Sequence, residues 1–221
     1  MIMPGCCSAG SATARHFNDE KARQELAAYQ RSGPGQTTRR LLAGLRGAGA
    51  SGTLLDVGAG IGALSLELLK AGMTTATCVD VAPAALAVGE AEARRQGLDR
   101  RMEWHEGDFV ELAPGLPAAD VVTLDRVVCC YPAYRPLLEE AAARSRELLG
   151  LSYPRDRWYV RLILRLENLW RRVTGNAFRA FVHPVAEMDQ LLQRAGFTPV
   201  YHETTLAWAT SVYARRDRPT G

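Results

Sequence analysis

The chain has 221 residues, 47% of them hydrophobic and 23% charged, so it is long enough to bury one core and its composition excludes global disorder. Its 27 basic and 24 acidic side chains leave a formal net charge of +3. Such a small charge disfavours an extensive phosphate-binding surface, and we therefore expect a small-molecule ligand and no nucleic acid.

The residues before position 53 predict helices. One is predicted over Ala12 to Gln30, where a Ser-Gly-Pro-Gly run ends it, and a second over Thr37 to Arg46. We expect residues 1–47 to form a tail and a helical cap, and residues 48–221 to form the main domain. Tyr29 in this cap is a candidate to reach a bound ligand.

From Thr53 onward, short apolar runs alternate with helical segments. Strands are predicted at Thr53–Val57, Thr74–Asp80, Met102–Glu106, Asp120–Leu124 and Leu149–Ser152, with helices at Ile61–Ala71, Pro83–Gln96 and Tyr134–Leu148. Because each crossover between parallel strands needs a helix, this alternation predicts a doubly wound α/β fold.

The tail departs from this alternation. Helices are predicted at Arg157–Val173 and Val185–Ala195, and two closely spaced strands at Thr198–Thr204 and Leu206–Ala214 must pair antiparallel. The first helix is basic and amphipathic. We expect segment 155–183 to be a lid whose arginine face is solvated, with contact to a membrane surface or an acidic protein as the alternative.

Three glycines, Gly58, Gly60 and Gly62, stand at alternate positions where the first predicted strand turns into a helix. Glycine permits a tight turn and a close approach by a ligand, and the helix beyond presents free N–H groups. A dinucleotide would also suit this spacing. Asp56 favours a ligand with a cationic ammonium group instead, because its carboxylate would repel a pyrophosphate.

Two further acids follow the next strands. Asp80 ends the second strand, where it can accept the hydroxyls of a ribose, in an adenosyl ligand or in NAD. Asp108 and Phe109 follow the third strand, where an acid can accept an adenine amino group and an aromatic ring can cover its face.

These residues resemble the class I S-adenosylmethionine-dependent methyltransferases, whose Asp-x-Gly-x-Gly-x-Gly motif matches Asp56 to Gly62. The resemblance extends over Thr53 to Arg215. It implies a seven-stranded, mostly parallel, Rossmann-like sheet with the last strand inserted antiparallel. It also implies S-adenosylmethionine as cofactor, bound by Asp56, Gly58, Ala59, Gly60, Gly62, Asp80, Val81, Asp108, Phe109 and Asp125.

Within this class, the chain is similar to the magnesium-protoporphyrin O-methyltransferases at three short segments. They are His16-Phe17-Asn18, Ser152-Tyr153-Pro154 and the run from Phe178 to His183. That family generally has tyrosine where His16 stands. The resemblance implies methylation of a carboxylate or hydroxyl oxygen on a small organic acid or a tetrapyrrole-like molecule.

The end of the fourth strand should face the reacting methyl group, because ligands bind at the carboxyl ends of the strands in this fold. Asp125, Arg126 and Tyr131 follow that strand and are the catalytic candidates, together with His183. A carboxylate acceptor would be held by Arg126, Arg179 or His183, and the proton of a hydroxyl acceptor would pass to His183 or Tyr131. The alternatives are an Asp125–Arg126 pair that orders a loop and a histidine that begins a helix.

The cysteines predict reduced thiols, because Cys6, Cys7, Cys78, Cys129 and Cys130 show neither a disulfide framework nor a zinc spacing. Cys129 and Cys130 suggest thiol chemistry, but neighbours in an extended chain point to opposite sides, so small buried side chains are the favoured interpretation. With no signal peptide or membrane span in the sequence, a cytoplasmic location is the expectation.

Two other functions stay open at this stage. An NAD-dependent oxidoreductase would need a substrate domain or a catalytic Tyr/Lys pair, and the sequence shows neither clearly. A protein that binds S-adenosylmethionine without catalysis would have the same glycine turn.

Overall fold

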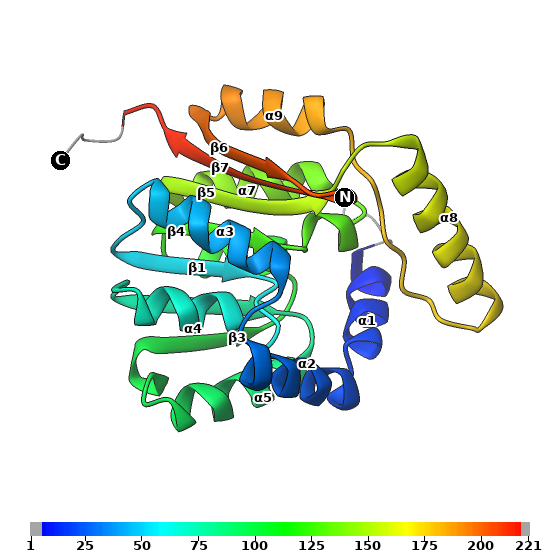
Figure 1. Ribbon diagram of the computed structural model, residues 1–221, viewed down its shortest axis with the longest axis horizontal. Helices are drawn as coiled ribbons and strands as arrows, with labels where there is room; N and C mark the ends of the chain where they lie inside the picture. Colours follow the sequence, from blue (N-terminus) through cyan, green and yellow to red (C-terminus); the bar gives the residue numbers. More distant parts are fainter. Residues whose placement is uncertain (1–5, 218–221) are drawn as a thin grey trace.

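A seven-stranded sheet forms the centre of the computed structural model, which describes residues 6–217. The side chains of residues 6–9 and 11, and with them the thiols of Cys6 and Cys7, lie outside the described part. The strand order is β3-β2-β1-β4-β5-β7-β6 (Figure 1). The strands are β1 (Thr53–Val57), β2 (Thr75–Asp80), β3 (Met102–Glu106), β4 (Ala119–Asp125), β5 (Ser145–Pro154), β6 (Phe197–Thr204) and β7 (Trp208–Arg215).

Strands β1 to β5 are parallel, and β7 runs antiparallel to both of its neighbours, β5 and β6. This confirms the doubly wound sheet with an inserted antiparallel strand. The chain builds outward from β1 to β3, then returns to the other side of β1 to form β4 and β5. The chain connections thus lead away from each other on the two sides of the β1–β4 boundary. This leaves a crevice between the carboxyl ends of β1 and β4, where ligands bind in such sheets.

Helices cover both faces of the sheet (Figure 1). Adjacent residues of a strand point to opposite faces, so Leu54 packs in one hydrophobic cluster and Leu55 in the other. One face is covered by α3 (Gln36–Gly47), α4 (Ala63–Lys70) and α5 (Pro83–Arg95), and the other by α6 (Phe109–Leu112), α7 (Tyr134–Arg144) and α9 (Val185–Arg194).

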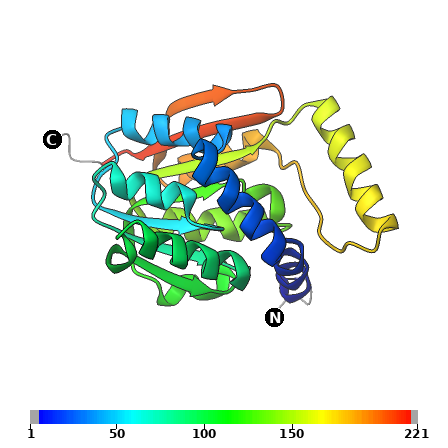
Figure 2. The ribbon, with the colours of Figure 1, turned by 60° about the horizontal axis from the view of Figure 1, so that its bottom comes forward.

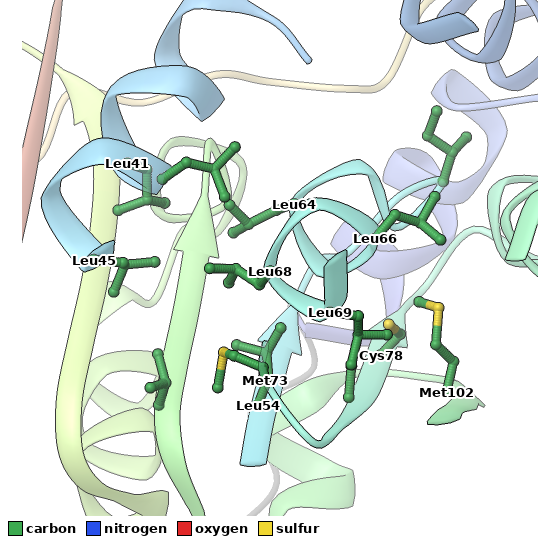
Figure 3. Packing of buried hydrophobic residues seen from close by; sticks show 14 of the residues in the cluster. Leu41, Leu45, Leu54, Leu64, Leu66, Leu68, Leu69, Met73, Cys78 and Met102 are labelled. Atoms are coloured by element: carbon green, nitrogen blue, oxygen red, sulfur yellow. The ribbon is translucent and has the colours of Figure 1, made fainter. Parts of the chain in front are cut away.

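Helix α3, expected as part of a cap, contributes to the main core. Leu41 and Leu45 are fully buried, and Figure 3 shows them between β5 and the leucines of α4. A Cβ atom on Gly150 of β5 would lie 2.9 Å from Leu41 Cδ1, so the absence of a side chain there lets α3 pack closely. Burying each leucine contributes roughly 1.5–3 kcal/mol.

The helix predicted over Ala12 to Gln30 is two helices, α1 (Cys6–His16) and α2 (Asp19–Ser32). The break lies at Asn18, which has an extended backbone and whose side chain accepts a hydrogen bond from the Lys21 backbone N–H at 3.2 Å. Asparagine is a preferred N-cap residue, and here that local signal overrides a continuous helical pattern.

The helix predicted to end at Leu148 ends at Arg144, and residues 145–148 open strand β5 instead. The Ser145 Oγ donates to the Leu148 carbonyl, and Ser145 pairs with Ala119 of β4. Pairing with β4 thus makes this segment a strand, although its composition suits a helix. Three 3-10 turns, η1 (Asp99–Arg101), η2 (Ala113–Gly115) and η3 (Val128–Cys130), complete the described elements.

Helix α8 (Trp158–Val173) stands at the side of the molecule, joined to the rest by extended segments (Figure 2). We expected its arginine face to be solvated, but large apolar side chains such as Trp158 and Trp170 also face outward. Among residues 6–217, no helix has the length and apolarity that a membrane crossing requires.

Candidate active site

A cavity of about 860 Å³ opens at the carboxyl ends of β1, β2 and β4. Its floor is the sheet edge, and its walls come from α1, α2 and the inner side of α8. This volume lies within the range of small-molecule sites, roughly 300–1,000 Å³. Of the predicted cofactor residues, the lining includes Asp56, Gly58, Ala59, Gly60, Asp80, Val81, Asp108, Phe109 and Asp125.

The glycines of the turn after β1 differ in what they face. Gly60 has a φ of +57°, and a Cβ atom there would meet only Glu25 Oε2, at 3.9 Å, so this position opens into the cavity. Gly62, at φ +72°, is the N-cap of α4, and a Cβ atom there would lie 2.7 Å from Trp104 Cη2. Gly62 packs against Trp104 and is not in the cavity lining, so its predicted contact with a cofactor stays a prediction.

Asp56 is almost completely buried below this turn. Its Oδ2 accepts a hydrogen bond from Ser65 Oγ, and its Oδ1 accepts one from Thr123 Oγ1, both at 2.7 Å. Burial raises the pKa of Asp56 to about 7, so its charge is poised near neutral pH. A cationic group in the cavity would favour the ionised carboxylate.

Asp80, at the end of β2, braces the glycine turn. Its Oδ2 accepts from the Gly60 backbone N–H and its Oδ1 from the Ala82 backbone N–H, both at 2.8 Å. Each carboxylate oxygen has a further lone pair, so the group can still accept two vicinal hydroxyls. Burial raises the pKa of Asp80, which makes these bonds important for keeping it charged.

Asp108 and Tyr131 form a second polar pair in the cavity. The Tyr131 hydroxyl donates to both Asp108 carboxylate oxygens, at 2.7 and 2.9 Å, and the Val110 backbone N–H donates to Oδ1. The Tyr131 hydroxyl is thus engaged as a donor to Asp108, and its role in acceptor deprotonation stays a prediction. Phe109 lies beside them with 4% of its surface exposed.

Asp125 and Arg126 join the end of β4 to the N-terminal helices. Asp125 Oδ2 accepts from Thr38 Oγ1 of α3 at 2.5 Å, and Arg126 Nη2 lies 3.2 Å from Glu25 Oε1 of α2. Arg126 has a φ of +63°, a left-handed conformation that is uncommon for a residue with a side chain. The sequence did not indicate Thr38 or Glu25, because their partners lie 87 and 101 positions away.

Two predicted substrate residues do not line the cavity. His183 Nε2 lies 3.0 Å from the backbone carbonyls of Val128 and Tyr131, and burial lowers its pKa. Arg179 Nη1 donates to the Asn176 and Phe178 carbonyls. Both side chains contact main-chain carbonyls in this arrangement, and their catalytic and substrate roles stay predictions.

Tyr29 lines the cavity, but its hydroxyl points to α4. It donates to Glu67 Oε1 at 2.8 Å and accepts from Lys70 Nζ at 3.0 Å. The ring therefore forms part of the wall, and the hydroxyl fastens α2 to the core.

Cationic and aromatic groups of α1, α8 and the segment after α8 meet at the cavity, and His16 and Phe178 among them belong to two of the segments that carry the resemblance. His16 stacks on Phe178 with ring centroids 4.3 Å apart, and the Arg171 guanidinium lies 5.2 Å from the Phe178 centroid. Burial, together with the charges of Lys21 and Arg171, lowers the pKa of His16 to about 4. Burial is the larger cause of this shift, and the two nearby cations add to it.

Charged side chains of both signs line the cavity. Four aspartates, Asp56, Asp80, Asp108 and Asp125, lie at or just after the strand ends, whereas Lys21, Arg39 and Arg171 come from the helices and Arg126 from the loop after β4. Glu25 and Glu167 also line the cavity and pair with Arg126 and Arg171. The aspartates offer acceptors for the ammonium, the ribose hydroxyls and the amino group of an adenosyl amino acid, so the residues fit S-adenosylmethionine.

Comparison with known proteins agrees with this geometry. The family model of a methyltransferase domain matches residues 54–148. No curated protein matches the chain in sequence.

Solved structures extend the comparison to nearly the whole chain. Magnesium protoporphyrin IX methyltransferase from Synechocystis PCC 6803 with bound S-adenosylhomocysteine (SAH) is 18% identical, with a TM-score of 0.73 over 94% of this chain and 99% of that one. The same enzyme with bound S-adenosylmethionine gives a TM-score of 0.69 at 18% identity over 94% and 97% of the chains. An O-methyltransferase family protein from Burkholderia thailandensis is 17% identical, with a TM-score of 0.64 over 90% of this chain and 58% of that one.

The domain match, the fold and the shape of the glycine turn point the same way, and they leave no support for an NAD-dependent oxidoreductase. Residues 54–148 are a methyltransferase domain, and the chain as a whole has the fold of S-adenosylmethionine-dependent methyltransferases.

Proposed function

We propose that this enzyme methylates an oxygen of a small acceptor with an apolar body and an anionic group, and that this group is a carboxylate. The observation that carries the proposal is that Lys21, Arg126 and Arg171 all line the cavity. Arg126 is paired with Glu25 and Arg171 with Glu167, so an acceptor carboxylate would compete with these glutamates for the two guanidinium groups. Phe17 and Phe178 stand among these cations and provide apolar surface.

The residues of this chain have three tasks in such a reaction. The aspartates of the strand ends hold the cofactor, which supplies a methyl group already activated by its sulfonium. Arg126 and Arg171 hold the acceptor carboxylate by charge-assisted hydrogen bonds and so orient one oxygen toward that methyl group. The cap aromatics exclude water. A carboxylate is ionised at neutral pH, so no residue has to remove a proton.

The experiment is an acceptor screen that measures the release of S-adenosylhomocysteine. Porphyrin carboxylic acids and simpler aromatic acids are compared with their own amides and with phenols. We expect turnover of acids and none of the matched amides. Turnover of phenols alone contradicts a carboxylate acceptor, and cofactor binding without turnover of any acceptor supports a non-catalytic protein.

Two cation variants sharpen this screen. Lys21→Gln and Arg171→Gln should each raise KM for an acid by about tenfold or more, because each removes a charge-assisted contact. Arg94→Gln, on the exposed side of α5, is the matched control and should leave KM unchanged. Equal effects of all three substitutions would contradict a role for Lys21 and Arg171 in binding the acceptor.

A further inference from the structure

The outward side of α8 carries seven large apolar side chains. They are Trp158, Leu162, Ile163, Leu166, Leu169, Trp170 and Val173, and each exposes between 47% and 74% of its surface. Two of them are tryptophans, one at each end of the helix. Monomeric proteins rarely leave such a continuous apolar surface uncovered, so this face indicates an interaction site.

The spacing of these residues places them on one face. At 100° per residue they fall within an arc of about 140°, whereas Val160, Leu164 and Arg171 fall on the opposite side. Val160 is buried, and Leu164 and Arg171 line the cavity. The helix therefore has its inner contacts already, and the outer apolar face is additional to them.

A separate segment extends this face. Leu206, in the turn between β6 and β7, is 79% exposed, and its carbonyl accepts a hydrogen bond from Tyr159 of α8 at 2.7 Å. The Arg155 backbone N–H donates to the Ala207 carbonyl at 2.8 Å. The hairpin is thus fixed beside the start of α8, and we call these eight apolar side chains, the seven of α8 with Leu206, the outer face.

Charge distinguishes the surroundings of the outer face from the rest of the chain. Segment 155–183 contains seven arginines and two acidic residues, a net charge of +5, while the remaining residues carry a net charge of −2. Arg161, Arg165 and Arg172 lie along one edge of the outer face. Arg165 and Arg172 are exposed and make no ion pair with any residue of the described range.

We propose that the outer face docks on the surface of an anionic lipid bilayer. An interfacial helix buries an apolar face with tryptophan and leucine, while arginines beside it contact anionic headgroups. A helix of 16 residues, about 24 Å long, would lie flat on that surface. The opposite side of α8 walls the cavity, so docking would place the active site next to the bilayer.

The test is co-sedimentation of the protein with vesicles of phosphatidylglycerol and phosphatidylcholine in equal amounts, and with vesicles of phosphatidylcholine alone. We expect binding to the mixed vesicles at least tenfold stronger than to the neutral ones, and weaker binding as salt is added. The fluorescence of Trp158 and Trp170 should shift to shorter wavelength on binding.

Two double variants test the two parts of the surface. Trp158→Ser with Trp170→Ser should abolish binding, and Arg165→Gln with Arg172→Gln should weaken binding to mixed vesicles by about 30-fold, because each arginine near an anionic surface contributes about fivefold. Val200→Ser and Arg94→Gln are the matched controls, since they change an exposed apolar and an exposed basic residue elsewhere. They should bind as the unsubstituted protein does.

Three outcomes would overturn the proposal. The first is equal binding of the parent protein and both double variants, and the second is no binding to mixed vesicles. The third is a dimer, seen by light scattering, that the tryptophan substitutions dissociate, because the outer face would then be covered by a second copy. Circular dichroism of each variant checks that it is folded, and these surface substitutions should leave the fold intact.

Discussion

The Sγ atoms of Cys129 and Cys130 lie 3.7 Å apart, and both contact the Arg126 carbonyl oxygen. We expected adjacent cysteines to point to opposite sides, as in an extended chain. They lie instead in the 3-10 turn η3, which brings neighbouring side chains closer in direction. Both also line the cavity.

This pair should bind a trivalent arsenical, which bridges two thiols. In a Cys6→Ser and Cys7→Ser background, we expect one phenylarsine oxide per chain by mass spectrometry, with loss of methyltransferase activity. S-adenosylhomocysteine should protect, because it fills the same cavity. Cys130→Ser should prevent stable binding of the arsenical, and retention of the adduct in that variant would contradict the prediction.

Gly60 and Gly62 provide a matched pair of substitutions. Both alanine variants place a Cβ on a left-handed residue, which costs roughly 1 kcal/mol. Gly60→Ala adds a methyl group to the cofactor cavity, so its main effect should be weaker binding of S-adenosylhomocysteine by calorimetry. Gly62→Ala meets Trp104 at 2.7 Å and should mainly lower the Tm. The prediction would be contradicted if Gly60→Ala mainly lowered the Tm and Gly62→Ala mainly weakened the binding of S-adenosylhomocysteine.

Asp56 should make folding stability depend on pH. Its pKa rises from 3.8 to about 7 on burial, so between these values the native state holds a proton that the unfolded chain has lost. The stabilisation is complete below about pH 4 and is lost as the pH rises to about 7. Asp56→Asn cannot titrate. Its free energy of unfolding relative to the parent protein should therefore rise by roughly 2–4 kcal/mol over that window, as measured by urea titration.

Asp80→Asn should weaken S-adenosylmethionine binding by about 1–3 kcal/mol, because charge-assisted hydrogen bonds to the ribose become neutral ones. Asparagine keeps one acceptor for the Gly60 or Ala82 backbone N–H, so the turn should persist. Calorimetry gives the affinity, and Asp99→Asn in turn η1 serves as the control. An unchanged affinity in Asp80→Asn would contradict the placement of the ribose next to Asp80 at the end of β2.

Arg126 allows backbone strain to be separated from side-chain function. Arg126→Gly and Arg126→Ala both remove the guanidinium and should raise KM for a carboxylate acceptor by about 10- to 100-fold. Glycine accepts a φ of +63° readily and alanine does not, so the glycine variant should be the more stable by about 1 kcal/mol. Equal Tm values of the two variants would show that the backbone at position 126 leaves the left-handed conformation in the alanine variant at little cost.

The sheet could be predicted from the sequence because its signals are local. Alternating strands and helices after Thr53 and the glycine turn of Val57 to Gly62 depend on residues close together in the chain. Where tertiary pairing competes with a local pattern, as at residues 145–148, the helix prediction was wrong.

The candidate site was predictable on the sheet side only. Asp80 and Asp108 were predicted as site residues because Asp80 ends β2 and Asp108 lies two residues after β3, and strand ends meet at one edge. Lys21 and Arg171 come from helices whose position relative to the sheet has no sequence signal. His183 and Arg179 were predicted from the chemistry of their side chains, but both side chains contact main-chain carbonyls.

The uneven distribution of charge also acts at a distance. With +5 on segment 155–183 and −2 on the remaining residues, the net positive charge of the molecule is concentrated around α8. In the field of a polyanionic surface, this uneven distribution would favour encounters that begin at α8 over encounters at a random side. Salt would slow such encounters without changing the chemistry inside the cavity.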